Sequence, residues 1–210
     1  MIKNKEKLKT LIENVNQWAE DKGIHSKGNC FTQLMKTHEE VGELINAIYH
    51  NNKEETIDAI GDVLVTIINA VWFTDFIDIN EVINVSSNHL VEPEEDVFSN
   101  VLFLDKHKTY LIESYVKFEK EQDGYSKDSF ITDVYTVVET LLEICYVLNL
   151  EITDCLEAAY NVISKRYVGH GRAAPHSAAS PPEWAGASGP RPRGIPACRP
   201  HRRTRNGPCC

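Results

Sequence analysis

The feature that most limits how this 210-residue chain can fold is the segment from Lys53 to Phe76. It is long enough for a helix of roughly six turns, and Val63–Phe73 within it is almost continuously apolar. A helix that is apolar all round must be covered by other parts of the protein. The segment therefore predicts a buried helix at the centre of a sizeable core.

Apolar residues at three- and four-residue spacings predict helices over most of the chain up to residue 168. The turn "HNNK" between two of these helices is short enough to make them antiparallel neighbours. No stretch alternates with a period of two, so the sequence predicts an all-α bundle. The predicted helices cover residues 5–21, 32–50, 53–76, 106–121, 129–149 and 152–167.

Three further predictions concern the segments outside these patterns. Residues 21–30, "DKGIHSKGNC", are expected to form a polar loop. Residues 78–105 mix turn residues with Pro93 and brief apolar patches, so we expect a connection with short helical pieces. Thr153 is expected to cap the last helix.

The net charge of −9 combines two segments of opposite composition. Residues 1–168 hold 15 basic and 30 acidic side chains, a net charge of −15, whereas residues 169–210 hold seven Arg and one Glu, a net charge of +6. The second segment has eight of the nine prolines and no Leu, Val, Phe, Tyr or Met. It cannot bury enough apolar surface to offset its ordering entropy. We therefore expect one domain over residues 1–168 and a disordered tail over 169–210.

The origin of the tail has two interpretations. The change from Lys, Asn and Ile to Arg, Pro, Ala and Gly suggests a shift from AT-rich to GC-rich coding, as a read-through, a frame shift or an appended cloning sequence would produce. The rival interpretation is a native basic arm that binds nucleic acid. Against it, the arginines are diluted by Pro and have no interleaved aromatic residues, so we leave the tail out of the fold prediction.

Cysteine pattern and hydropathy limit the compartment. Cys30, Cys145 and Cys155 form no C-x-x-C pair, which predicts small buried thiols rather than a disulfide framework or a zinc site. The longest apolar run is shorter than the roughly 20 residues of a membrane span. The amino terminus alternates charge instead of forming a signal-peptide h-region. We therefore expect a cytoplasmic protein with no membrane contact.

Two acidic stripes accompany the apolar residues of neighbouring predicted helices. Each stripe covers no more than about 100° of its helix, so its side chains leave from one broad edge. The stripe on the 53–76 helix interrupts a segment that otherwise requires burial. The first stripe consists of Glu39, Glu40 and Glu43, and the second of Glu55, Asp58, Asp62 and Asn69.

An antiparallel arrangement lets these stripes face each other. Like charges in a partly dry site repel and lose solvation, so the arrangement requires cations or bound protons. Oxygen ligands suit Mg²⁺ or Mn²⁺, and the lack of His or Cys at useful spacing argues against zinc. The alternative is a solvated helix face, the usual role of an acidic cluster. Asp58 and Asp62, beside the most apolar segment of the chain, favour the metal site.

Other chemistries lack their motifs. In "THEEVG", Gly42 stands where an H-E-x-x-H motif has its second His. No E-x-x-H occurs before residue 169, which excludes a di-iron bundle of the ferritin type. No G-K-[ST] follows Gly23 or Gly28, so there is no phosphate-binding loop, and no Ser or Cys lies in a nucleophile elbow.

The two stripes also resemble a known family. "EEVGEL" at Glu39–Leu44, followed by "DAIGDVLVTIINA" at Asp58–Ala70, resembles the MazG-like members of the all-α nucleoside triphosphate pyrophosphohydrolases. "NVNQWAEDKGI", "NCFTQLMK" and "DCLEAAYNVISKR" resemble their lead-in and closing segments. The resemblance is good over residues 10–77 and 135–167, weak over 78–134 and absent from the tail.

This resemblance implies the fold and a reaction. Family members hydrolyse the α–β phosphoanhydride of a (d)NTP to give (d)NMP and pyrophosphate. They hold Mg²⁺ with a pattern E-E-x-x-E followed by E-x-x-D. They are commonly dimers or tetramers, and the apolar 53–76 helix also predicts a surface buried against another subunit, so we expect a homodimer or homotetramer.

Carried over by position, the pattern assigns roles to individual residues. Its first half is present without change, and Asp62 fits the final Asp. Ala59, however, stands where the second-half Glu is expected, and the preceding Asp58 is expected to substitute for it. Glu39 is expected to orient or deprotonate the attacking water. The expected metal ligands are Glu40, Glu43, Asp58 and Asp62.

Substrate contacts must come from other side chains. Asn69 and Gln33 are expected to bond a base or sugar, with satisfaction of a buried backbone group as the alternative. Trp18 is either a stacking surface or, as we favour, part of the core. The expected phosphate-binding cations are Lys36, Lys165 and Arg166, and ordinary surface charge is their alternative role.

Two other functions compete with hydrolysis. Ala59 supports a catalytically inactive acidic helical module that binds a protein partner. An acidic mimic of nucleic acid would need its carboxylates spread over the exterior instead of converging. Stabilisation by Mg²⁺ or Mn²⁺ distinguishes a metal site from either surface.

Overall fold

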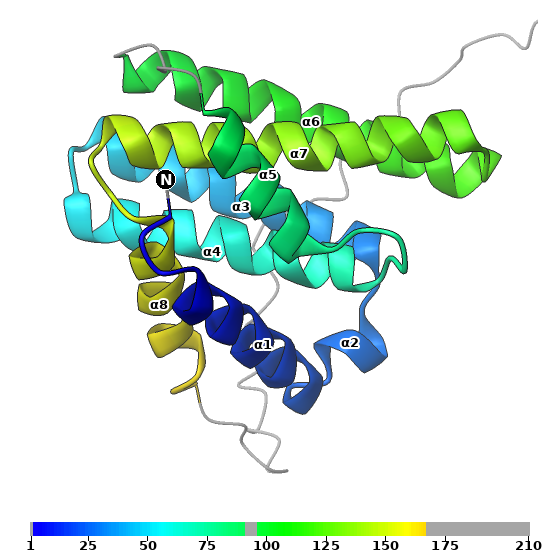
Figure 1. Ribbon diagram of the computed structural model, residues 1–210, viewed down its shortest axis with the longest axis horizontal. Helices are drawn as coiled ribbons and strands as arrows, with labels where there is room; N and C mark the ends of the chain where they lie inside the picture. The colour runs from blue at the N-terminus through cyan, green and yellow to red at the C-terminus, as the bar shows by residue number, and fades with distance from the viewer. Residues whose placement is uncertain (1, 91–95, 167–210) are drawn as a thin grey trace, which may run out of the picture. The chain divides into compact units, whose positions relative to one another are not determined.

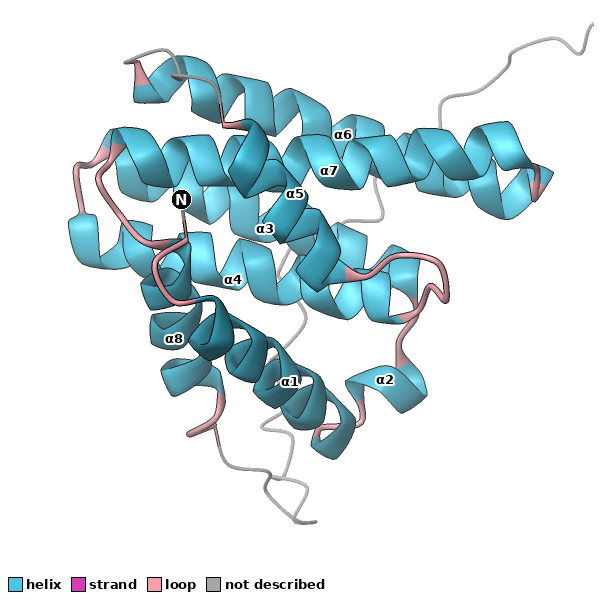
Figure 2. Cartoon of the chain, in the orientation of Figure 1, coloured by secondary structure: helices cyan, strands magenta, loops and turns pink. Residues whose placement is uncertain are grey.

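The computed structural model describes residues 2–90 and 96–166, and in these residues every regular element is a helix (Figure 1, Figure 2). The prediction of an all-α fold is confirmed. The predicted tail, residues 169–210, lies outside the described residues, as does Pro93. The helices are α1 (Lys5–Asp21), α2 (Ile24–Lys27), α3 (Cys30–Tyr49), α4 (Lys53–Trp72), α5 (Ile79–His89), α6 (Val97–Glu121), α7 (Gly124–Val147) and α8 (Ile152–Ile163).

Local capping sets the helix boundaries that differ slightly from the predictions. α3 begins at Cys30 rather than Thr32, because the Asn29 side chain accepts the backbone N–H of Thr32 at 2.8 Å. The Thr32 hydroxyl accepts the Asn29 backbone N–H at 3.1 Å in return, which completes a capping box. α4 ends at Trp72 rather than Phe76, where the Phe73 N–H turns to the carbonyl of Ala70.

Residues 78–105 contain more helix than predicted. α5 occupies part of this segment, and α6 already begins at Val97. Each helix has an aspartate at its N-cap: Asp78 accepts the backbone N–H of Asn80 at 2.9 Å, and Asp96 accepts that of Phe98 at 3.0 Å. These caps define helix starts that the weak apolar periodicity did not indicate.

Two local predictions are wrong. Thr153 does not cap α8 but lies inside it, 3% exposed. Glu151 occupies the N-cap position, and its carboxylate pairs with Lys3 instead of capping the helix. Residues 21–30, expected to be a loop, include the single-turn helix α2.

The predicted central helix is α4. All residues from Val63 to Val71 on this helix are buried. α4 packs against α3, α8 and α1, with α3 and α4 side by side in Figure 1. The apolar run therefore finds its cover within the chain, which explains why a segment without charge over nearly three turns is tolerated.

A three-residue turn, residues 50–52, makes α3 and α4 antiparallel. Asn51 adopts a left-handed conformation (φ 52°), which asparagine tolerates better than most residues. The backbone N–H of Asn52 donates to the carbonyl of Ala47 at 3.0 Å, and the Asn52 side chain then caps α4. The turn thus ends α3 and starts α4 with every residue between them in a defined conformation.

Gly61 allows α4 and α8 to approach closely. A Cβ atom at this position would overlap the backbone carbonyl oxygen of Cys155 and lie 2.6 Å from the Cβ of Ala159. Only glycine fits this contact unless the helices move apart. The close approach places α8 directly beside the helix that carries Asp62.

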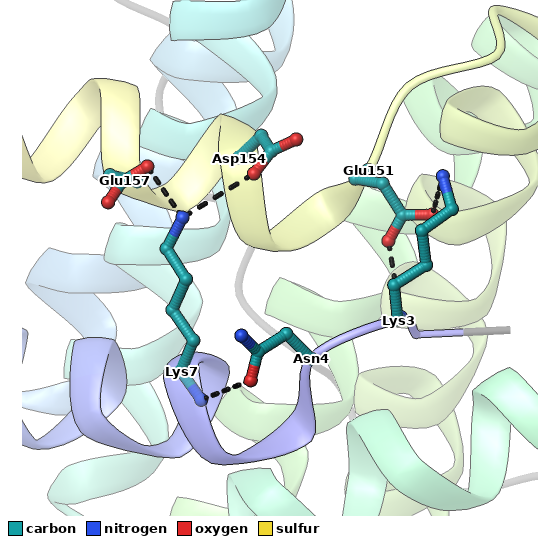
Figure 3. A network of polar contacts seen from close by, with 6 residues as sticks. All are labelled: Lys3, Asn4, Lys7, Glu151, Asp154 and Glu157. Atoms are coloured by element: carbon teal, nitrogen blue, oxygen red, sulfur yellow. Dashed lines mark hydrogen bonds and ion pairs between the residues drawn. The ribbon is translucent and has the colours of Figure 1, made fainter.

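Polar contacts tie α1 to α8 (Figure 3). Lys7 lies between two carboxylates of α8, 2.7 Å from Glu157 and 3.6 Å from Asp154. Lys3 is 3.0 Å from Glu151. These partly exposed pairs contribute little energy each, but together they fix the orientation of α1 on α8.

The second long antiparallel pair is α6 and α7. Phe130 of α7 is fully buried and contacts the rings of Phe118 and Tyr115 on α6. Cys30, Cys145 and Cys155 are buried free thiols, as predicted. In the part of the chain that the structure describes, no helix is long and apolar enough to cross a membrane.

Candidate active site

The antiparallel α3–α4 pair brings carboxylates of both acidic stripes to one open pocket of about 420 Å³, here called the acidic pocket; Glu40 and Asn69 are not among its lining residues. Five of its nine lining residues carry carboxylates, two from α3 and three, Asp62 included, from α4. The pocket therefore collects negative charge from two helices. Its lining consists of Glu39, Gly42, Glu43, Asn46 and Ala47 of α3 and Glu55, Asp58, Ala59 and Asp62 of α4.

Two carboxyl groups of this helix pair have raised pKa values. Burial is the largest cause at Glu40, and together with the charges of Asp62 and Glu43 it raises the pKa to about 7. Burial is also the largest cause at Asp62, and together with the charge of Asp58 it raises the pKa to about 6. Both carboxyl groups therefore hold protons more tightly than in water, chiefly because burial disfavours their charged form and also because negative charge is crowded there.

Such a donor set has the chemistry of a hard-cation site but not a completed cage. Carboxylate oxygens are the ligands that Mg²⁺ and Mn²⁺ prefer, and a divalent cation would offset the crowded charge. Within residues 2–90 and 96–166, no three His, Cys, Asp or Glu side chains are spaced to hold one metal ion. The acidic pocket thus fits a cation in charge and ligand type, and the side chains must close around it.

Glu39 lies at the exposed edge of the acidic pocket, paired with Lys36 one turn earlier on α3. The Lys36 ammonium donates to the Glu39 carboxylate, and this bond raises the pKa of Lys36. Glu40 and Glu43 act on Lys36 in the same direction. The Lys36 ammonium is therefore held in a locally negative environment made by the acidic stripe of α3.

Ala59 is buried (7% exposed) yet lines the acidic pocket between two acidic residues of α4. Its methyl group leaves space where the family pattern has a longer carboxylate. Asp58 lies at the same wall and acts electrostatically on Asp62. The structure thus brings Asp58 into the group with Asp62, as its predicted substitution for the missing Glu requires.

Arg166 joins this group from the end of α8. Its positive charge lowers the pKa of Asp62, opposing burial and Asp58. Lys165, its neighbour, is exposed. The charge of a residue that the sequence proposed as a phosphate-binding cation therefore acts on a proposed metal ligand, although more than 100 positions separate the two in the chain.

Further along the same face of α4, Asn69 is buried (1% exposed). Its Nδ2 donates to the carbonyl of Val65 at 3.0 Å, so its Oδ1 faces His25 Nε2, also at 3.0 Å. Because that oxygen can only accept, His25 donates from Nε2. Gln33 is half-buried on α3, two turns before Glu40. Its backbone carbonyl accepts a hydrogen bond from the Thr37 hydroxyl at 3.1 Å.

Sequence reasoning missed His25 and Trp72, which lie beside Asn69. Their rings stack with centroids 3.7 Å apart and planes 7° from parallel. Burial lowers the pKa of His25, so the ring is neutral at pH 7. His25 belongs to a segment interpreted as a polar loop, and no local pattern indicates that α2 folds back onto the end of α4.

The position of Trp18 agrees with the favoured interpretation that it belongs to the core. It is partly buried against the apolar core, and its indole Nε1–H donates to the carbonyl of Ile163 at 3.1 Å. The indole therefore connects α1 to the end of α8 and does not offer its nitrogen to a ligand.

Comparison with known protein families matches the part of the chain that carries the acidic pocket. A family model described as the MazG nucleotide pyrophosphohydrolase domain matches residues 31–98, which contain α4, α5 and nearly all of α3. All five proposed catalytic and metal-binding carboxylates lie inside this match: Glu39, Glu40, Glu43, Asp58 and Asp62.

A curated relative comes from a bacteriophage. An uncharacterized 18.2 kDa protein in the rep-hol intergenic region of Haemophilus phage HP1 (strain HP1c1) is 36% identical over 61 residues. The aligned segment covers 29% of this chain and 37% of the phage protein, so the chain spans little more than a third of that relative. No solved structure gives a significant match.

Proposed function

We propose that this chain, a MazG-like protein through residues 31–98, is a nucleoside triphosphate pyrophosphohydrolase that requires Mg²⁺, with Mn²⁺ as an alternative. The observation that carries the proposal is the convergence of carboxylates from α3 and α4 on one pocket. Burial and mutual repulsion raise the pKa of Glu40 and Asp62 there. A purely solvated acidic face would not show such crowding.

The proposed reaction cleaves the α–β phosphoanhydride of a (d)NTP. The oxygen of a water molecule forms a new bond to phosphorus, the bridging P–O bond breaks, and pyrophosphate leaves. When bound, the divalent ion supplies positive charge that stabilises the leaving pyrophosphate and makes the attacking water more acidic. The residues that would hold the ion are Glu40, Glu43, Asp58 and Asp62.

Glu39 is the proposed general base. It lies at the open edge of the acidic pocket, where water has access, and its Lys36 partner keeps the carboxylate oriented along α3. In this role Glu39 accepts the proton of the attacking water. Lys36 and Arg166 then supply positive charge for the phosphate groups, and Lys165 adds to it from the end of α8.

The nucleoside is proposed to lie along α4, away from the carboxylates. Asn69 follows Asp62 by seven residues, about 10 Å along the helix axis, which is the length scale of a nucleotide. Asn69 is buried and its amide is bonded to the Val65 carbonyl and to His25, whose ring stacks on Trp72, so the surface offered to a nucleoside at this end is the exposed part of Trp72. Gln33 lies on the facing part of α3.

A second candidate function is a catalytically inactive acidic module that binds a protein partner. Ala59 favours it, because this chain lacks the carboxylate that the family pattern has at that position. So does the spacing of the carboxylates, which in the described residues forms no ready metal cage. Nucleic acid is not a proposed partner, since residues 1–168 carry a net charge of −15.

Assembly and location remain part of the proposal. The burial of α4 is achieved within the chain, so this helix no longer demands a second subunit. A homodimer or homotetramer is proposed from the family resemblance and from exposed apolar side chains on α6, such as Phe98 and Leu102. We propose a cytoplasmic location, and light scattering on the purified chain measures its oligomeric state.

The test is pyrophosphate release by the full chain with Mg²⁺ across the common (d)NTPs. We expect pyrophosphate, and no orthophosphate, from at least one nucleotide. Glu40→Gln and Asp62→Asn should each lower the rate at least about a hundredfold while leaving the helical circular dichroism spectrum unchanged.

Glu143→Gln is the matched control. Glu143 is a partly buried carboxyl on α7 whose pKa is raised by burial and by Glu139, but it lies outside the acidic pocket. Its replacement should leave the rate unchanged. Full turnover by both Glu40→Gln and Asp62→Asn would show that the acidic pocket is not the active site.

A further inference from the structure

The lining of the acidic pocket contains one side chain that can donate a hydrogen bond at neutral pH. Five of the nine lining residues carry carboxylates, which only accept when ionised, and three have no polar side chain, Gly42, Ala47 and Ala59. The remaining residue is Asn46 of α3, whose amide nitrogen is a donor. The three cations proposed above to bind phosphate are not in this lining. A ligand oxygen inside the pocket that needs a side-chain donor must therefore find it at Asn46.

The Asn46 amide has no partner in the part of the chain that the structure describes. Asn46 is exposed on α3, and its backbone carbonyl accepts the His50 N–H at 3.1 Å as the helix requires. The side chains of Asn29 and Asn52, by contrast, cap helices. Asparagine is a poorer helix former than alanine, so helix formation does not explain an asparagine at position 46. Its amide is available to a ligand in the pocket.

Gly42 lies one turn before Asn46 on α3 and lines the same pocket. In a helix interior, glycine is less favourable than every other residue except proline. At Gly61 of α4 the close contact with Cys155 explains the glycine, but a Cβ at Gly42 would meet nothing within 4 Å. Packing within the described chain therefore does not require glycine at position 42. A ligand lying against the α3 backbone would require it, because any side chain there would extend into the pocket.

The pocket extends along the helix pair toward the turn at residues 50–52. Of its lining residues on α4, Asp62 is the farthest from this turn and Glu55 the nearest, and Asn46 lies at the turn end of α3. Seven residues, about 10 Å of helix, separate Asp62 from Glu55, and seven separate it from Asn69 in the opposite direction. The proposed nucleoside position is on the Asn69 side. A phosphate chain that passes the carboxylates therefore extends toward the turn and toward Asn46.

We propose that Asn46 binds the terminal phosphate of the nucleotide, its Nδ2 donating to a phosphate oxygen, and that Gly42 leaves the space in which the phosphate chain lies against α3. This rests on the proposed function, which supplies the polyphosphate and its direction. A nucleotide with a shorter phosphate chain does not reach Asn46, so the two residues make the site specific for triphosphates. The leaving pyrophosphate contains the terminal phosphate, so Asn46 binds pyrophosphate as well.

The experiment measures the binding of magnesium pyrophosphate to full-length variants by calorimetry, together with pyrophosphate release from (d)NTPs. Asn46→Asp keeps the shape of the side chain and replaces the amide donor by a carboxylate. It should raise the dissociation constant of magnesium pyrophosphate, and lower kcat/KM for the best (d)NTP, by at least about tenfold. Asn46→Gln, which keeps an amide donor, should recover most of both losses.

The nucleoside monophosphate product is the internal reference, because it does not reach position 46. Its dissociation constant should change less than about twofold in Asn46→Asp. An equal weakening of monophosphate and pyrophosphate binding would mean that Asn46 supports the whole site rather than one phosphate, and would overturn the proposal.

Gly42→Ala tests the space against α3 independently. The substitution should raise the melting temperature by about 3 °C, because alanine favours the helix and its Cβ meets no other atom. It should also weaken the binding of magnesium pyrophosphate at least about tenfold, since the methyl group occupies the path of the phosphate chain. Damage to the fold cannot produce a more stable protein that binds more weakly. Unchanged pyrophosphate binding would overturn the role of Gly42.

Asn161→Asp is the matched control. Asn161 is exposed on α8 and outside the lining of the pocket, so this substitution adds the same negative charge and keeps the Asn46 donor. Both measurements should stay unchanged, and a tenfold loss would reduce the Asn46 effect to net charge.

The outcomes separate this proposal from the hydrolase function. Pyrophosphate release by Asn46→Asp at the rate of the unchanged protein would overturn the role of Asn46 and leave the hydrolase standing, and undetectable binding of magnesium pyrophosphate would do the same. Binding of magnesium pyrophosphate that depends on Asn46, without hydrolysis of any (d)NTP, would refute the hydrolase and support the phosphate site.

Discussion

The α3–α4 pair and the α6–α7 pair are two versions of one arrangement, long antiparallel helices joined by a tight turn. Both carry glutamates four residues apart, Glu39 and Glu43 on α3 and Glu139 and Glu143 on α7. At Glu40 the raised pKa reflects burial, then Asp62 of the facing helix and Glu43 of its own helix, whereas at Glu143 the acid contributing to the raised pKa, besides burial, is Glu139 of its own helix. Two glutamates four residues apart on one helix therefore do not by themselves indicate a site. A carboxylate on the facing helix is also needed.

The largest effect on stability should come from adding one methyl group, by a Gly→Ala substitution, to a helix of each pair. Gly61→Ala on α4 places a methyl group against the Cys155 backbone and the Ala159 side chain, so α8 must move away. We expect a loss of about 3 kcal/mol in the free energy of unfolding. Gly124→Ala, at the start of α7, meets nothing within 4 Å and should gain about 0.5 kcal/mol. Denaturant melts of both variants measure the contrast, and equal effects would contradict the tight α4–α8 contact.

A smaller effect should separate the pairs by their response to metal. Mg²⁺ or Mn²⁺ at a hundred times its dissociation constant should stabilise the protein by about 2.7 kcal/mol, because it binds the folded state alone. Glu40→Gln should remove this rise in melting temperature and Glu143→Gln should keep it. An unchanged melting temperature in the unsubstituted protein would favour the acidic interaction module over the hydrolase.

The pH dependence of stability should sharpen the same difference without metal. The pKa of Glu40 is about 7 and that of Asp62 about 6 in the folded protein, against ordinary values of 4.5 and 3.8. Between these limits the folded state binds more protons than the unfolded state, so stability falls as pH rises from about 4 to 7. Melting in EDTA at pH 5 and pH 8 should show a smaller difference in the Glu40→Gln, Asp62→Asn double variant. A difference as large as that of the unsubstituted chain would place the titrating groups elsewhere.

The smallest effect is expected from residues outside both pairs. A chain ending at Val168 should retain the melting temperature and any pyrophosphate release, because the acidic pocket draws on residues 39–62 and on Arg166. Side-by-side assays of the two lengths measure this. A clear loss of turnover would assign a role in the reaction to residues 169–210.

Much of this architecture follows from local sequence. The apolar run of α4 required cover on all sides, and the turn at Asn51 required an antiparallel neighbour, so the approach of the acidic stripes could be predicted. The start of α6 could not, because it depends on a single capping bond at Asp96 rather than on apolar periodicity. Thr153 does not cap α8, because the helix begins one residue earlier, at Ile152, and packing buries the threonine side chain inside it.

The parts of the candidate site that escaped prediction depend on how helices cross. The charge of Arg166 acts on Asp62 across the α4–α8 pair, whose close contact Gly61 allows, and His25 bonds Asn69 because α2 folds onto the end of α4. Neither relation has a period or spacing in the sequence. Local pattern can nominate residues for a site, but contacts between distant helices decide which of them meet.

The turn at Asn51 and Asn52 has a consequence for how such a chain can vary in length. Inserting one residue there would slide α4 by about 1.5 Å and rotate it by about 100° relative to α3. Asp58 and Asp62 would then point away from the carboxylates of α3, although every one of them would still be present. In natural or engineered relatives, insertions should therefore be absent from this turn and tolerated at the turn after Glu121, where no site depends on the register of the two helices.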